Sequence, residues 1–232
     1  MDALILAGGL GTRLREAVPD LPKPMAPIRN RPFLEHQMDY WIGQGVTRFI
    51  LSVGYKHEVI EAHFGNLYRQ CPVVYAREVT PLGTGGGLLL GLSHAKNDLV
   101  LVLNGDTFFE VNLSDMRARH DAAQADVTVA LRRIAQNDRY GEVALDTQGN
   151  VTTFSSVASG GEGIINGGVY LLRPSVLLGF GYAPGDKVAL EQDLFPQLFK
   201  AGKRMAGYIS DTTFIDIGIP EDYYRASEVL PN

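Results

Sequence analysis

Short apolar runs alternate with stretches of helical spacing along the first 130 residues. Runs such as 3–7 (ALILA) and 99–103 (LVLVL) are almost wholly apolar, which is typical of strands buried on both faces. The pattern predicts strands at 3–7, 49–53, 73–76, 99–103 and 127–131. It predicts helices at 32–44, 58–64, 85–94 and 114–124, the last with Ser114 as its N-cap. This alternation indicates an α/β fold: a Rossmann-like, doubly wound, mostly parallel sheet with helices on both faces.

Beyond residue 132 the runs become shorter and are separated by Gly or Asn turns. We expect a small β subregion here, with a loop at 159–163. The expected strands are 142–146, 151–154, 164–172, 205–209 and 213–217, and the expected helices are 190–201 and 221–229. No linker or repeat interrupts the sequence, so we expect one domain over 1–232, with an N-terminal region at 1–132 and a C-terminal region at 133–232.

Composition removes several classes of protein. The 232 residues are 45% hydrophobic and 20% charged, as in an ordinary globular chain. A net charge of −5 argues against a nonspecific nucleic-acid binder. Cys71 is the only cysteine, so no intrachain disulfide or Cys zinc cluster can form. No run approaches the roughly 18 apolar residues that span a bilayer. The N-terminus lacks a basic region before its apolar run. We therefore expect a cytoplasmic protein without a membrane partner.

A glycine-rich loop follows the first predicted strand. In segment 6–14 (LAGGLGTRL), Gly8, Gly9 and Gly11 allow backbone N–H groups to approach an anion closely. Arg13 adds a forked cation suited to phosphate. The order of residues matches neither G-x-x-x-x-G-K-[ST] nor G-x-G-x-x-G, so two common phosphate loops are excluded. The glycines alone are equally consistent with a tight strand-to-helix turn.

Lys23 follows the loop, held between two prolines in segment 21–25 (LPKPM). Together with the glycine loop, this segment resembles the sugar-1-phosphate nucleotidylyltransferases. The resemblance implies that the N-terminal region binds a nucleoside triphosphate and that the C-terminal region binds the sugar. It implies catalytic roles for Arg13, Lys23 and Asp106. It assigns nucleotide binding to Leu6, Ala7, Gly8, Gly9, Gly11, Thr12, Arg13, Lys23, Glu78, Pro81, Gly83 and Thr84.

Segment 78–86 (EVTPLGTGG) is the next match, and the resemblance makes Glu78 the residue that reads the base. Relatives that use thymidine or uridine nucleotides often carry glutamine there. An ionised carboxylate can accept hydrogen bonds from both N1–H and the N2 amino group of guanine, whereas uracil and thymine would oppose it with carbonyl oxygens. We therefore expect GTP as the nucleotide; an ordinary surface glutamate is the alternative. The doubled Gly85-Gly86 favours the heptose-1-phosphate enzymes of this family.

Two aspartates are candidates for a metal site. Asp106 directly follows the strand at 99–103, at the edge where parallel sheets bind ligands. Asp216, in segment 214–220 (FIDIGIP), resembles the second aspartate of the family. The resemblance implies that the two aspartates together hold a single Mg²⁺ ion, which also binds phosphate oxygens. Each aspartate alone would be explained as a turn residue or a helix-entry residue.

The resemblance is weaker on the sugar side. It implies sugar binding by Asn104, Gly141, Glu162, Asn166 and Gly167. Many relatives carry a Glu-Lys pair that contacts the sugar and its phosphate, but segment 154–157 (FSSV) lacks it. The cation that replaces the lysine is left open among Arg132, Arg133 and Lys187.

The resemblance implies that a sugar 1-phosphate, a heptose 1-phosphate in our interpretation, attacks the α-phosphorus of GTP and releases pyrophosphate. The alternatives are a mannose-1-phosphate guanylyltransferase, a uridylyl- or thymidylyltransferase, and a noncatalytic nucleotide-sugar-binding subunit. A metal-dependent glycosyltransferase fits less well, because segment 104–106 (NGD) is not a D-x-D pair. The partners are therefore GTP and a sugar 1-phosphate, without nucleic acid. Homo-oligomer formation is left open.

Overall fold

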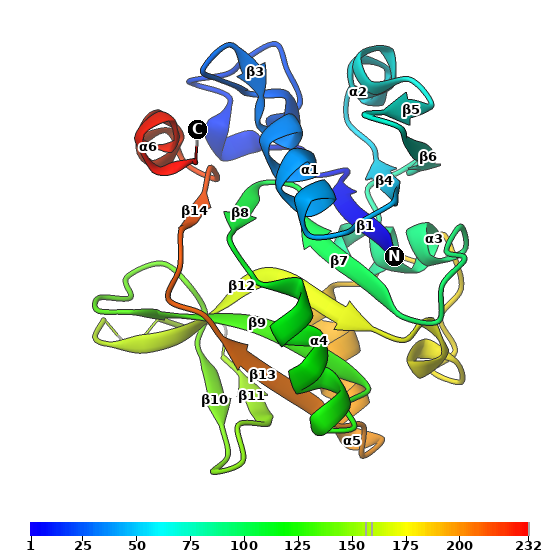
Figure 1. The fold of residues 1–232 in the computed structure, drawn as a ribbon, viewed down its shortest axis with the longest axis vertical. Helices are drawn as coiled ribbons and strands as arrows, with labels where there is room; N and C mark the ends of the chain where they lie inside the picture. The colour runs from blue at the N-terminus through cyan, green and yellow to red at the C-terminus, as the bar shows by residue number, and fades with distance from the viewer. Residues whose placement is uncertain (156, 159, 232) are drawn as a thin grey trace.

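The computed structural model describes residues 1–155, 157–158 and 160–231. Eight strands form one sheet in the order β13-β9-β12-β7-β1-β4-β6-β5 (Figure 1). Its strands are β1 (Asp2–Ala7), β4 (Arg48–Val53), β5 (Leu67–Tyr68), β6 (Cys71–Arg77), β7 (Val100–Asn104), β9 (Val127–Ile134), β12 (Gly163–Leu172) and β13 (Met205–Ile209). Strands β7, β1, β4 and β6 are parallel neighbours, and β13 is parallel to β9. The predicted mostly parallel α/β fold is confirmed.

Strand β12 differs from its prediction. Residues 164–172 were expected as one of the shorter strands of a small β subregion; the strand is confirmed, but the ten-residue β12 lies inside the main sheet, antiparallel to both β7 and β9. Glycines at 167 and 168 conceal this in the sequence because they interrupt the apolar run. The register shifts between Asn166 and Tyr170, where Gly168 has a φ of +70°. The separate β ribbon contains only β10 (Val143–Leu145) and β11 (Val151–Phe154).

Helices cover both faces of the sheet. Helices α1 (Phe33–Gly43), α2 (His57–Phe64) and α4 (Leu113–Ala122) contribute to one apolar cluster, in which Trp41 packs with Ile5 and Leu51. Helices α3 (Gly83–Leu92) and α5 (Phe195–Lys200) contribute to the cluster on the other face, around Leu4. The two-sided cover is what the near-continuous apolar strands predict.

A third apolar cluster joins the C-terminal segment to the residues that follow the glycine loop. Helix α6 (Pro220–Val229) and Ile217 pack with Leu14 and Phe33, and Figure 1 shows α6 beside the hairpin that carries β3.

The remaining elements are η1 (Thr12–Leu14), η2 (Lys23–Met25), β2 (Pro27–Ile28), β3 (Arg31–Pro32), β8 (Thr107–Phe109), β14 (Phe214–Asp216) and η3 (Pro174–Leu177). Strand β14 pairs with β8, so the end of the chain returns to the turn after β7.

The predicted N-cap of α4 was wrong. Helix α4 is capped by Asn112, whose side chain accepts from the Asp115 N–H at 3.1 Å, and not by Ser114. The helix expected at 190–201 is confirmed over 190–200: it begins with a π-helical turn, η4 (Leu190–Leu194), and continues directly as α5, in which Pro196 has no N–H to donate to a regular helical hydrogen bond. The segments 154–157 and 159–163 each include one residue, Ser156 and Ser159, that lies outside the described residues.

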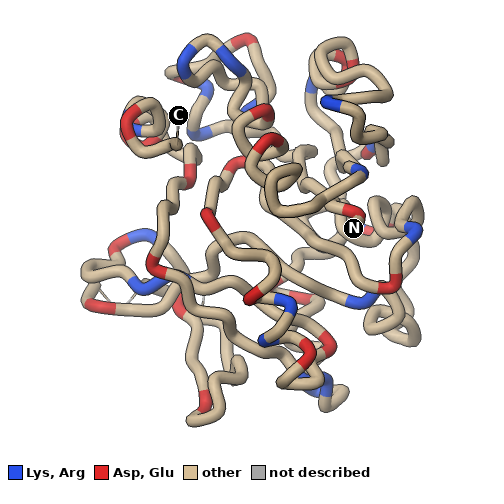
Figure 2. Tube along the Cα trace, viewed as in Figure 1, with Lys and Arg blue, Asp and Glu red and all other residues tan. Residues whose placement is uncertain are grey.

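Figure 2 shows basic and acidic positions spread together over the trace. An anion must therefore be held by local groups and not by the field of the whole molecule. Within the described ranges, none of the helices combines the length and the apolar character needed to cross a membrane.

Candidate active site

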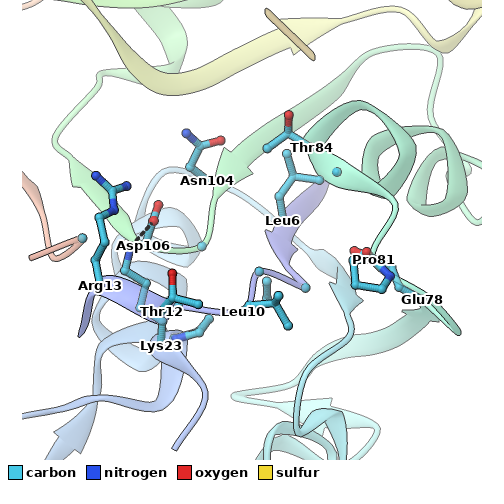
Figure 3. Close-up of a pocket in the computed structure, with 18 residues that line it drawn as sticks. Leu6, Leu10, Thr12, Arg13, Lys23, Glu78, Pro81, Thr84, Asn104 and Asp106 are labelled. Carbon is cyan, nitrogen blue, oxygen red and sulfur yellow. Dashed lines mark hydrogen bonds and ion pairs between the residues drawn. The ribbon is translucent and has the colours of Figure 1, made fainter. Parts of the chain in front are cut away.

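A pocket of about 370 Å³ opens at the carboxyl ends of β1 and β7. All twelve residues expected to bind the nucleotide line it, together with Asn104 and Asp106. Leu10, Pro24, Gly105 and Gly218 also line it, although the sequence analysis did not single them out. Figure 3 shows Arg13, Lys23 and Asp106 on one side of this pocket and Glu78 and Pro81 on the other. The structure thus brings together residues from segments more than 80 positions apart, as the Lys23–Asp106 contact illustrates.

Two glycines of the loop occupy positions where a side chain would clash or strain the backbone. A Cβ on Gly8 would lie 2.1 Å from Oε1 of Glu78. Gly11 has a φ of +59°, a left-handed conformation, where the chain turns into η1. A side chain at Gly8 would therefore displace Glu78, and one at Gly11 would strain the turn that places Arg13.

Two cations lie at one end of the pocket. The Lys23 Nζ atom is 2.5 Å from Oδ2 of Asp106, and only 10% of the Lys23 side chain is exposed. Arg13 is exposed and forms no hydrogen bond or ion pair within the portion of the chain that the structure describes. Its guanidinium is therefore available to an anion that enters the pocket.

Asp106 and Asp216 meet where β8 pairs with β14, since Asp216 lies opposite Thr107 in register. The Asp216 carboxylate accepts hydrogen bonds from the Gly218 N–H at 2.7 Å and from Arg139 at 3.2 Å. Burial and the nearby charge of Asp106 raise the pKa of Asp216, while Lys23 and Arg139 act in the opposite direction. The negative charge of Asp106 therefore disfavours ionisation of Asp216 unless positive charge lies beside the pair.

The donor set fits Mg²⁺. In the described residues no group of three or more His, Cys, Asp or Glu side chains could hold a metal. Two carboxylates suffice for Mg²⁺, which commonly takes one or two from the protein and completes its shell with phosphate oxygens and water. A divalent cation would also offset the electrostatic repulsion between Asp106 and Asp216. Metal binding at this pair remains a prediction.

Glu78 lies half-buried at the other end of the pocket. Its Oε1 accepts from the Ser52 hydroxyl at 3.2 Å, and its Oε2 accepts from the Leu82 N–H at 3.0 Å. Burial raises the pKa of Glu78, and these two donors partly offset the rise. The carboxylate is thus held in a fixed place while further lone pairs stay available for a base.

The predicted sugar residues are less well gathered. Asn104 lines the pocket, whereas Asn166 donates to Glu191 at 2.5 Å and to the Tyr170 hydroxyl at 2.7 Å. Gly167 is buried, and a Cβ there would lie 2.4 Å from the Phe109 ring, so the position has no room for a side chain; sugar binding by Gly167 stays a prediction. The other two predicted sugar residues, Gly141 and Glu162, do not line the pocket, and Glu162 is exposed.

Arg139 was not predicted from the sequence as a site residue. Its guanidinium bridges Asp216, at 3.2 Å, and Asp222 at the start of α6, at 2.6 Å, while lying 4.4 Å from the centre of the Tyr140 ring. The signal in the sequence is its position two residues before Gly141, which was already singled out, but its two acidic partners lie 77 and 83 residues away. Arg139 therefore supports one of the two carboxylates, Asp216, while Lys23 pairs with the other.

Comparison with known proteins agrees with this geometry. The model of the nucleotidyl transferase family matches residues 2–232. The chain belongs to this family. A family member from Aneurinibacillus thermoaerophilus, a D-glycero-alpha-D-manno-heptose 1-phosphate guanylyltransferase, is 44% identical over 99% of this chain and 98% of its own. The enzyme of the same name from Campylobacter jejuni is 42% identical over 97% and 98%. The family resemblance seen in the glycine loop and Lys23 is confirmed.

Solved structures share the fold. HddC from Yersinia pseudotuberculosis, complexed with GMP-PN, has a TM-score of 0.85 at 34% identity and covers 98% of both chains. A structure from Bacillus anthracis described as a glucose-1-phosphate thymidylyltransferase, at 17% identity and a TM-score of 0.83, supports the fold alone. A mannose-1-phosphate guanylyltransferase from Mycobacterium tuberculosis is 34% identical, and the match covers 64% of that longer protein.

Proposed function

We propose that the protein transfers the GMP unit of GTP to D-glycero-α-D-manno-heptose 1-phosphate, which yields a GDP-heptose and pyrophosphate. The observation that carries this proposal is the arrangement of one pocket: Arg13 and Lys23 at one end, and the carboxylate of Glu78 at the other. The full-length similarity to two guanylyltransferases of that name supports the same sugar and base.

The reaction needs alignment and charge neutralisation more than proton transfer. An oxygen of the sugar 1-phosphate forms a bond to the α-phosphorus of GTP, and the bond from that phosphorus to the α–β bridging oxygen breaks. Pyrophosphate leaves with that electron pair. The attacking oxygen already belongs to an anion, because the second pKa of a phosphate monoester is near 6. No general base is required, and the site's cations have the roles that the reaction needs.

Arg13 and Lys23 hold the triphosphate in this proposal. Arg13 is free of partners among the described residues and offers a bidentate fork to phosphate oxygens. Lys23 is nearly buried, so its charge acts at short range with little screening by solvent. Together they stabilise the negative charge that grows on the leaving pyrophosphate.

Asp106 and Asp216 would hold Mg²⁺, which supplies charge neutralisation and helps to align the phosphates when it is bound. The protein's own contribution is the placement of these two carboxylates. Arg139 and the Gly218 N–H fix Asp216, and Lys23 fixes Asp106 before the substrate arrives.

Glu78 would read guanine. Ser52 and Leu82 orient its carboxylate from behind, and the remaining acceptor positions suit the adjacent N1–H and N2 amino donors of guanine. A uracil in the same place would present carbonyl oxygens to a carboxylate. The same physical argument therefore favours GTP over UTP and dTTP.

Pyrophosphate release tests the proposal. It is measured for each of five triphosphates (GTP, UTP, dTTP, CTP and ATP) with each member of a panel of sugar 1-phosphates. We expect the highest kcat/KM for GTP with the heptose 1-phosphate. A preference for UTP or dTTP would contradict the role of Glu78. Mannose 1-phosphate is the second candidate acceptor, because a 34% identical relative bears that activity in its name. A clear preference for mannose 1-phosphate would replace the heptose assignment.

A further inference from the structure

A buried glutamine of α1 reaches the turn that carries Asp106. Gln37 is 1% exposed, and its Nε2 donates to the carbonyl oxygens of Asn104 at 2.8 Å and of Thr107 at 2.7 Å. Both partners are acceptors, so only the amide nitrogen can face them. Gln37 therefore clamps the two ends of the turn 104–107 with a single side chain.

The middle of this turn has its own supports. The Gly105 N–H donates to the Leu6 carbonyl at 3.0 Å, and the Ile217 N–H donates to the Asp106 carbonyl at 2.9 Å. A Cβ on Gly105 would lie 2.7 Å from the Leu6 oxygen, so the turn is pressed against the end of β1. Gln37 supplies donors for the carbonyls on either side of the Gly105–Asp106 pair.

We infer that Gln37 is a positioning residue that sets Asp106 for the magnesium-bound triphosphate, acting through the backbone of turn 104–107. The inference rests on the proposed function and on the magnesium role proposed for Asp106. Gln37 itself does not line the pocket. Groups that orient a metal ligand from behind typically affect metal affinity or activity by about 10- to 100-fold when they are removed.

Calorimetry of GTP binding with and without Mg²⁺ tests this in Gln37→Met, which keeps the length of the side chain and removes the donors. We expect GTP binding without Mg²⁺ to be unchanged, because the hydrogen bonds of Gln37 go to turn 104–107 and not to the glycine loop or Glu78. The gain in GTP affinity on adding Mg²⁺ should fall by about tenfold or more. If Gln37 contributed only to general packing, its replacement would change GTP affinity alike with and without Mg²⁺.

A double-mutant cycle with Asp106→Asn tests whether Gln37 acts through Asp106. If Gln37 acts through Asp106, Gln37→Met should cause little further loss of the Mg²⁺-dependent gain once Asp106 is already asparagine. Thr128→Val is the matched control, because Thr128 is fully buried and bonded to His120 Nδ1 at 2.9 Å, yet neither residue lines the pocket. This control should lower the melting temperature and leave the Mg²⁺-dependent gain intact.

Gln37→Asn, which keeps an amide but is one methylene shorter, provides the measurement if the methionine variant does not fold; we expect an intermediate loss of the gain. A full Mg²⁺-dependent gain in either variant, or additive losses with Asp106→Asn, would overturn the inference. Such a result would leave wild-type transfer of GMP untouched, so it is distinguishable from failure of the proposed function. A wild-type protein whose GTP affinity ignores Mg²⁺ would overturn both the magnesium proposal and this inference.

Discussion

Lys23 is the residue on which the charges of the site converge. Its ammonium is paired with Asp106, and a Cβ placed on Gly218 would lie 3.2 Å from its Nζ and 2.8 Å from Oδ1 of Asp216. The three charged groups therefore occupy one small volume, in which a change to any of them alters the balance for the others.

Replacing Lys23 by alanine or Asp106 by asparagine should lower turnover at saturating GTP by at least about tenfold, because each change would remove a charge that we propose to stabilise the transition state. Pyrophosphate release measures the rate, and circular dichroism checks that the fold persists. Lys203→Ala is the matched control, since Lys203 pairs with Asp126 at 3.8 Å and does not line the pocket. Wild-type rates in both site variants would reject their assigned roles.

Glu78→Gln should weaken the discrimination between GTP and UTP. A good bidentate contact to a base discriminates by about 1–3 kcal/mol, so the GTP/UTP ratio of kcat/KM should fall by about tenfold or more. Glutamine presents one donor and one acceptor where guanine needs two acceptors. An unchanged ratio would show that Glu78 does not read the base.

The same variant tests the pKa of Glu78. Burial raises this pKa in the folded protein, so the folded state binds the proton more readily than the unfolded state. Keeping the carboxylate ionised therefore costs stability above the raised pKa, and this cost disappears as the pH falls. Without ligand, Glu78→Gln should melt at a higher temperature than wild type at about pH 8, and the difference should narrow as the pH approaches 4.5, the ordinary Glu value. A difference that widens on acidification would contradict the stated burial.

At the scale of elements, the start of α3 is built by close contact with a distant segment. The N–H groups of Gly85 and Gly86 both donate to the Val188 carbonyl, at 2.9 and 3.0 Å. A Cβ on Gly86 would lie 2.3 Å from the Asp186 carbonyl oxygen. The glycines therefore allow segment 186–190 to cover the helix end that borders the side of the pocket where Glu78 lies.

Gly86→Ala should destabilise the protein by about 1–3 kcal/mol, because an extra methyl must displace backbone in a packed region. Gly43→Ala in α1 is the matched control: a Cβ there meets nothing within 4 Å, so alanine should stabilise the helix slightly. Urea denaturation measures both variants. Equal stability of the two would contradict the tight contact at Gly86.

Element prediction from the sequence succeeded where burial dominates. Strands β1 and β7 are apolar at nearly every position, and their type and place follow from that alone. The pairs β2–β3 and β8–β14 escaped prediction as pairs, because strands of two or three residues carry no periodicity. Strand β12 was misplaced because its register shifts around Gly168, which only the paired neighbours reveal.

At the scale of the whole molecule, residues from the N-terminal and the C-terminal parts of the chain line the same pocket. Ile217 and Ala226 pack with Leu14, and this packing brings Asp216 to the end of the pocket that holds Lys23. The glycine loop was predictable because it is local. The partnership of Asp216 with Lys23 was not, since nothing in the spacing encodes it and only the family resemblance suggested it. The single domain expected over 1–232 stays a prediction.

The fate of isotopic label from GTP tests the central claim most directly. With the heptose 1-phosphate and Mg²⁺, radioactive phosphorus in the α-position should appear in the sugar nucleotide, and label in the β- or γ-position should appear in pyrophosphate. Arg13→Ala, which would remove the proposed phosphate contact and leave Glu78 intact, should slow both transfers together. Label from the γ-position in inorganic phosphate or on the sugar, or no transfer of the α-label at all, would contradict an attack on the α-phosphorus and the reaction assigned to this pocket.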